Sequence, residues 1–249
     1  MISRHEVYSP LQNTAVWLAA WLYGAEPTDT VVDALRELGG RHSWAETTGV
    51  ELLREVRAAT ELNSAGPAVR LILSGPGQPP ALPPGSDAAA AMGDSGAIVL
   101  RGQSVSHILV PDYTPDSGTS WRWFEETERL PEPEWLSPGE ADARLSTAAT
   151  SAATIIAATD GTNANVADPR LMVGTLADFY DTPGLPMGVS PRAAKLFARA
   201  DNVAAIVETV TDRLNDHSFD PQLLGLWRHI RSARMAGVAD AVINYARGG

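Results

Sequence analysis

The chain has 249 residues, 44% of them hydrophobic, which is enough apolar material to build a core rather than a disordered segment. Its formal net charge is -11 at pH 7, which argues against a protein that coats nucleic acid or an anionic membrane. The absence of cysteine excludes disulfides, thiolate-bound metals and cysteine nucleophiles. We therefore expect a cytoplasmic protein without a nucleic-acid or membrane partner.

Three short helices are predicted before the first strand. The first begins at Pro10, directly after a serine in a capping-box pattern, and continues to about Gly24. The second is predicted over residues 29–38 and ends at a pair of glycines, which favour the end of a helix. The third follows residues 42–44 and ends near Thr60.

The hydrophobic period then changes from 3.6 to 2, which indicates strands. The first predicted strand covers residues 69–73, and a proline-rich surface loop follows it because proline cannot pair inside a sheet. A hairpin is predicted over residues 97–101 and 105–110, joined by a two-residue type II′ turn that begins at Gly102. A further antiparallel strand is predicted over residues 121–125, so we expect a small antiparallel sheet of about four strands.

Every element after residue 137 is predicted to be helical. An alanine-rich helix starts from a capping-box pattern at Ser137, and a shorter helix starts at Asp168. Two long amphipathic helices follow over residues 190–216 and 220–247. The link between them is only three residues long, which would let the two helices lie antiparallel.

The predicted fold class is α+β in two portions. Residues 1–130 are expected to hold the N-terminal helices and the small antiparallel sheet. Residues 137–249 are expected to be all-helical and to contain the long antiparallel helix pair. The two portions are expected to dock as one compact body.

Three features together resemble a known family. They are the Ser9-Pro10-Leu11-Gln12 start with its tryptophan helix, the strand that runs into Gly75-Pro76-Gly77, and the helical tail. They resemble a conserved actinobacterial protein family of unknown function. The resemblance spans both portions and implies no activity, cofactor or site residue.

One string resembles a catalytic motif. Gly93-Asp94-Ser95-Gly96 is similar to the nucleophile segment of trypsin-like proteases. That class is built from two β-barrels with a histidine before the serine, whereas helices precede this string and a largely helical region follows it. A turn that enters the strand at residue 97 therefore fits the context better. With no phosphate-binding glycine loop and no histidine pair at helical spacing, we expect no cofactor and no metal.

Four residues are candidates for a ligand cleft between the two portions. His107 on a hairpin strand and Arg122 on the next strand supply acid–base and cationic groups. Asp178 and Tyr180 place a carboxylate and an aromatic ring beside a stiff proline loop, as ligand clefts do. Strand alternation puts His107 on the face opposite Ile108, so it is equally explained as a half-buried strand residue.

A second candidate site is a group of arginines in the last two helices. Arg228, Arg231 and Arg234 recur at three-residue steps, and Arg213 lies late in the preceding helix. Guanidinium groups bind phosphate or carboxylate in a fork, which suggests an anionic ligand or an acidic partner. The alternative is that these arginines pair with acidic residues of the same chain or are simply solvated.

The leading functional hypothesis is a non-enzymatic binding protein whose helical portion contacts a protein partner or a second copy of the chain. This hypothesis predicts that the long helices carry apolar residues outside the stripe that faces the core. The alternative is an enzyme or a small-anion-binding protein with a cleft between the two portions.

Overall fold

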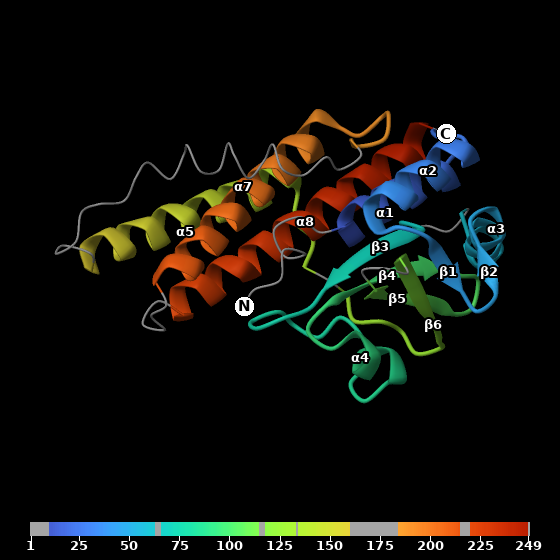
Figure 1. The fold of residues 1–249 in the computed structure, drawn as a ribbon, viewed down its shortest axis with the longest axis horizontal. Helices are drawn as coiled ribbons and strands as arrows, with labels where there is room; N and C mark the ends of the chain where they lie inside the picture. Colours follow the sequence, from blue (N-terminus) through green and yellow to red (C-terminus); the bar gives the residue numbers. More distant parts are fainter. Residues whose placement is uncertain are drawn as a thin grey trace.

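A computed structural model describes residues 10–62, 66–114, 118–132, 134–159, 184–214 and 220–248. Its helices are α1 (Pro10–Leu22), α2 (Thr28–Gly39), α3 (Val50–Ala59), α4 (Asp87–Met92), α5 (Pro138–Thr159), α7 (Pro191–Leu214) and α8 (Asp220–Gly248). Its strands are β1 (His42–Trp44), β2 (Thr47–Thr48), β3 (Val69–Leu73), β4 (Gly96–Arg101), β5 (Ser106–Thr114) and β6 (Gly118–Glu126). Figure 1 shows α5, α7 and the start of α8 extending away from the sheet as a helical bundle.

The sheet has six strands in the order β2-β1-β6-β5-β4-β3 and is mixed. β1 lies parallel to β6, with His42 opposite Thr119, and the other neighbours are antiparallel. The prediction of a small, purely antiparallel sheet of about four strands is therefore wrong. β1 and β2 have three and two residues, too few to show a period, and β1 pairs with a strand far away in the sequence.

The β4–β5 connection also differs from its prediction. Arg101 pairs with Ser106, and the Gly102 N–H donates to the Val105 carbonyl over 3.0 Å. The turn therefore comprises the four residues 102–105 rather than a two-residue type II′ turn. Predicting the shorter turn was an error of register, because the polar residues after Gly102 fit either length.

The short helix α4 was not predicted. It begins after Ser86, whose hydroxyl accepts a hydrogen bond from the Ala89 N–H over 3.2 Å. It leads into the Gly-Asp-Ser-Gly string, where the Ser95 hydroxyl donates to the Met92 carbonyl over 2.6 Å. Ser95 thus closes a turn that enters β4, as the context predicted.

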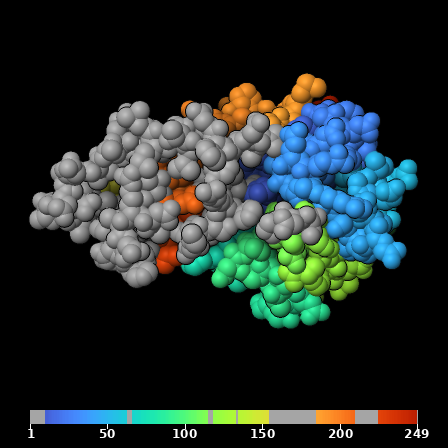
Figure 2. All heavy atoms as spheres, viewed as in Figure 1, coloured from blue at the N-terminus to red at the C-terminus, as the bar shows by residue number. Residues whose placement is uncertain are grey.

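Each face of the sheet carries its own core, as strand alternation requires. Leu100 and Leu109 face α1 and α3, in a core that includes Trp17, Trp21 and Trp121. Val99 and Ile108 face α4 and the proline-rich loop. In the space-filling view, the residues of α2 to β2 in blue adjoin the green residues of the later strands in one continuous surface (Figure 2).

The last helix belongs to both parts of the molecule. The first part of α8 packs with α5 and α7 in a core that contains Leu145, Leu196 and Ile230. Its later part packs on α1 and β3, so Val238 and Val242 belong to the sheet core. α8 therefore connects the C-terminal helices to the sheet core. An apolar stripe shows that a helix is buried but not which element covers it.

Candidate functional site

Three of the four predicted arginines, Arg228, Arg231 and Arg234, lie on α8, where the bundle meets the sheet half. Arg234 has only 2% of its surface exposed. Its Nη2 atom lies 2.8 Å from Oδ1 of Asp201 on α7, and its Nη1 donates to Oε1 of Gln12 on α1 over 3.1 Å. Burial raises the pKa of Asp201, and the Arg234 charge opposes that shift. Arg234 of α8 is therefore a buried residue that links α8 to α7 and α1.

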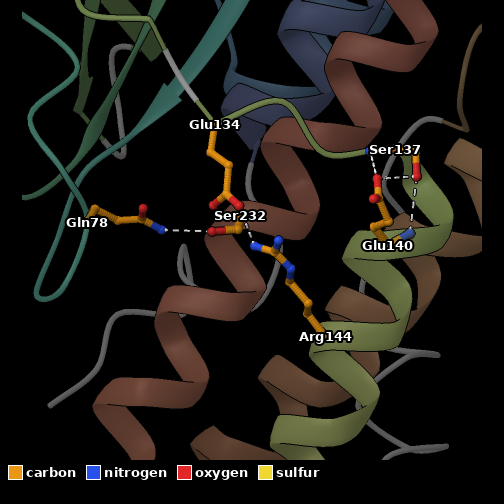
Figure 3. Close-up of polar contacts among 6 residues, drawn as sticks. All are labelled: Gln78, Glu134, Ser137, Glu140, Arg144 and Ser232. Atoms are coloured by element: carbon orange, nitrogen blue, oxygen red, sulfur yellow. Dashed lines mark hydrogen bonds and ion pairs between the residues drawn. The ribbon is translucent and has the colours of Figure 1, made fainter.

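Arg231 and its neighbours hold the loop that follows β3. The Arg231 Nη2 atom donates to the Pro76 carbonyl over 2.7 Å. The Gln78 amide donates to the Arg228 carbonyl over 3.0 Å and to the Ser232 hydroxyl over 3.3 Å, the second of which is drawn in Figure 3. The proline-rich loop is thus attached to α8 rather than lying free on the surface.

The connecting segment and α5 complete this junction. Arg144 on α5 donates to Oε1 of Glu134 over 2.7 Å, and Figure 3 shows both side chains beside Ser232 of α8. The Glu140 carboxylate accepts hydrogen bonds from the Ser137 N–H and hydroxyl, and the Glu140 N–H donates back to that hydroxyl. The capping box predicted at Ser137 is confirmed, and it sets where α5 begins.

A small hollow lies at the centre of the junction. It has about 30 Å³ of space and is bordered by Glu134, Arg144, Arg228 and His229. This space suits a single water molecule rather than a metabolite. Burial lowers the pKa of His229, and the positive charges of Arg228 and Arg144 lower it further. The surroundings of His229 therefore favour its neutral form.

Of the four predicted cleft residues, the structure describes only His107 and Arg122, and it places them on opposite faces of the sheet. His107 lies on the face of the sheet that α1 and α3 cover, in line with Leu109. Arg122 lies on the opposite face, where its Nη2 donates to the Ala91 carbonyl over 2.7 Å. Asp178 and Tyr180 lie outside the described residues, as does the side chain of Arg213.

Two tryptophan–histidine pairs on β6 were missed by the sequence analysis. The Trp121 indole N–H donates to Nδ1 of His42 over 3.1 Å, and the Trp123 indole N–H donates to Nδ1 of His107 over the same distance. In each histidine Nδ1 is therefore an acceptor, which fixes the neutral tautomer with its proton on Nε2. For His107, the signal was its place on the strand predicted next to the Trp-x-Trp strand, whereas β1, which carries His42, was not predicted.

Burial keeps both histidines neutral. It lowers the pKa of His42 to about 4, and a hydrogen bond to the Leu35 backbone opposes part of that shift. Burial also lowers the pKa of His107, against the opposing charge of Glu125, whose Oε1 lies 3.7 Å from Nδ1. Both imidazoles act as structural hydrogen-bond acceptors beside the sheet.

Two negative findings hold for the described ranges of the chain. No group of three or more histidine, aspartate or glutamate side chains there is arranged to hold a metal ion. No helix in those ranges combines the length and apolarity that a bilayer span requires.

Large apolar side chains are exposed mainly after residue 134 in the described part of the chain. Trp135 is 63% exposed, Met187 75%, Ile206 on α7 41% and Leu224 on α8 45%. In the sheet half, Val50 on α3 is 39% exposed. Each of the two long helices thus exposes one large apolar side chain, Ile206 on α7 and Leu224 on α8.

The fold and the junction define a class: a helix-covered mixed sheet fastened to a helical bundle through one shared helix. Residues 12–135 match the N-terminal domain of Rv1486c-like protein, and residues 139–235 match its C-terminal domain. The chain belongs to the Rv1486c-like protein family. Neither the search of curated proteins nor the search of solved structures gives a match.

Proposed function

We propose that this chain is a non-enzymatic binding protein whose C-terminal helices contact a protein partner, in the simplest case a second copy of the chain. The observation that carries the proposal is the exposure of Ile206 and Leu224 on the two long helices, at 41% and 45%. Exposed apolar side chains gain free energy when a partner removes them from water. Trp135 adds an aromatic ring of the kind that is enriched in protein interfaces.

The histidines and arginines that could carry chemistry are engaged in contacts within the fold, which supports a binding role. His42 and His107 accept hydrogen bonds from tryptophans, and Arg234 is paired inside the molecule. Arg231 donates to the backbone of the proline-rich loop. These groups stabilise the fold, which leaves the surface of the bundle as the feature to be explained by function.

The location we propose is the cytoplasm. The support is the lack of cysteine in all 249 residues, because secreted proteins of this size often use disulfides. The actinobacterial origin that the resemblance suggested stays a prediction.

The experiment is light scattering of the full chain across a concentration series, on wild type and two variants. Ile206→Glu places a charge on the proposed surface, and Val50→Glu is the matched control because Val50 is 39% exposed on the sheet half. We expect wild type to approach a dimer mass with rising concentration. We expect Ile206→Glu to weaken association roughly tenfold, since burying an unpaired carboxylate is costly.

The control should associate like wild type. A wild-type chain that stays monomeric at every concentration would contradict the second-copy form of the proposal. Equal weakening in Ile206→Glu and Val50→Glu would contradict the assignment of the surface to the bundle.

A further inference from the structure

A larger hollow lies among α2, α3, β1 and β2, at the end of the molecule opposite to α5 (Figure 1). We call it the α2–α3 pocket. It holds about 400 Å³, which is enough space for a small molecule. Its apolar walls are Val32 and Leu35 from α2 and Leu52 from α3. A pocket of this kind suits a ligand with an apolar body.

His42 brings a buried hydrogen-bond donor to this pocket. It borders the pocket and is only 7% exposed. Its Nδ1 accepts the Trp121 indole N–H, so Nε2 carries the proton and is the ring nitrogen that remains for the pocket. The Nε2 atom is buried and has no acceptor in full hydrogen-bond geometry within the described chain, so the contact of the ring with the Leu35 backbone is weak. An acceptor on a bound ligand would satisfy this N–H.

Two arginines add positive charge to the border of the pocket. Arg36 and Arg41 are both exposed to solvent. The Arg41 Nη2 atom donates to the Thr48 hydroxyl over 3.5 Å, a long hydrogen bond. The Arg36 Nη1 atom lies 4.0 Å from Oδ1 of Asp33, and such an exposed pair is weak. The described residues that border the pocket include no aspartate or glutamate, so the side-chain charge of its lining is positive.

The backbone at the start of α3 also favours an anion. Gly49 is the N-cap of α3 and borders the pocket, and no side chain caps this helix. The first N–H groups of a helix have no intrahelical partner and attract negative charge. Glu51 lies in the first turn of α3 but does not border the pocket. The end of α2 opposes an anion less than usual, because its Gly39 carbonyl already accepts the Thr119 hydroxyl over 2.8 Å.

We propose that the α2–α3 pocket binds a small carboxylic acid with an apolar body. The carboxylate accepts the Nε2–H of His42 and lies beside the two arginines and the start of α3. Guanidinium groups pair well with carboxylate oxygens. The apolar body contacts the walls from α2 and α3, which a small inorganic anion would leave in water.

The first test is calorimetric titration of the full chain with phenylacetate, phenylacetamide and acetate. Phenylacetamide keeps the shape without the charge, and acetate keeps the charge without the ring. We expect a Kd of about 1 mM or tighter for phenylacetate and roughly tenfold weaker binding of the other two compounds. Equal affinity for phenylacetate and either control compound, or no phenylacetate binding up to about 10 mM, would overturn the proposal.

The second test removes the arginine charges. Arg41→Gln should weaken phenylacetate binding roughly three- to fivefold, and the double variant with Arg36→Gln roughly tenfold. Arg54→Gln is the matched control, because Arg54 is exposed on α3 but does not border the pocket. It changes the net charge as Arg41→Gln does and should leave the affinity unchanged. Thermal unfolding verifies that each variant is folded. Equal losses in Arg41→Gln and Arg54→Gln would contradict the assignment of the site.

The third test follows His42 directly in long-range ¹H–¹⁵N spectra of the imidazole rings. The signal of His42 is the one that is missing in His42→Gln. Phenylacetate should shift the Nε2 signal of His42, because this atom gains an acceptor. The signal of His107 should stay in place, since His107 also accepts a tryptophan N–H but does not border the pocket. An unchanged His42 signal when phenylacetate saturates the protein would overturn the proposal.

Discussion

The sheet half and the helical bundle are packed from different material. The sheet core contains Trp17, Trp21 and Trp121 with several leucines. Half of the buried residues in the bundle core are alanines: Ala141, Ala152, Ala200, Ala204, Ala233 and Ala236. Alanines let helices approach closely but remove little apolar surface from water per residue.

This difference connects packing to function. In the described sheet half the large apolar side chains are buried or partly buried except Val50, whereas α7 and α8 leave Ile206 and Leu224 partly exposed to water. A bundle with a modest core gains more from a partner that covers its outer surface. The comparison therefore supports the bundle as the proposed interaction surface.

The largest expected effect on stability comes from the buried contact between Arg234 and Asp201. Arg234→Ala leaves Asp201 as a buried carboxylate without its partner, and we expect a loss of about 3–5 kcal/mol in the free energy of unfolding. Urea denaturation measures this loss. The double variant Arg234→Leu with Asp201→Leu should lose clearly less, because both charges are removed together. A loss below about 1 kcal/mol in Arg234→Ala would show that this contact does not hold the two parts together.

The next effect concerns the polar core of the sheet half and depends on pH. The pKa of His42 is about 4 in the folded chain and 6.5 when unfolded, so the unfolded chain takes up the proton first. The stability that neutral His42 contributes is fully present above its unfolded pKa of 6.5, and it is lost as the pH falls toward its folded pKa of about 4. We expect about 2 kcal/mol less stability at about pH 5 than at about pH 7.5 from this residue.

The control for this pH effect is His42→Gln, which keeps an acceptor for Trp121 but cannot titrate. Its stability should fall by about 2 kcal/mol less than that of wild type over the same interval. Identical pH profiles for the two proteins would contradict the assignment of a buried neutral His42.

The smallest effect compares two glycines of α8, one at the junction and one in the bundle. A Cβ atom on Gly237 would lie 2.3 Å from Cε1 of Phe197, whereas nothing lies within 4 Å of a Cβ on Gly225. Gly237→Ala should cost about 1–2 kcal/mol, because the ring must move. Gly225→Ala should stabilise the chain by up to about 1 kcal/mol through helix propensity. Thermal unfolding of both variants gives the signs, and a stabilising Gly237→Ala would show that the contact with Phe197 is loose.

Much of the local structure could be predicted from the sequence. α1 begins at the predicted Pro10, and α5 begins with the predicted capping box between Ser137 and Glu140. The Ser190 cap of α7 is present too, because its hydroxyl accepts from the Ala193 N–H over 3.1 Å. β3 occupies the predicted residues 69–73.

The candidate site could be predicted less well, because a residue's partner lies elsewhere in the chain. The spacing of Arg228, Arg231 and Arg234 showed a shared side of a helix but not that Asp201 and Pro76 face it. Arg122 and His107 lie on neighbouring strands, yet the register places them on opposite faces of the sheet.

Short-range patterns in the chain specified the described helices except α4 and four of the six strands, since caps, proline positions and hydrophobic periods act within a few residues. The mixed sheet, the pairing of β1 with β6 and the sharing of α8 between two cores were decided by contacts between distant segments. Burial and charge act between groups that only the folded chain brings together, and the distance between two residues in the sequence does not show whether they will be in contact.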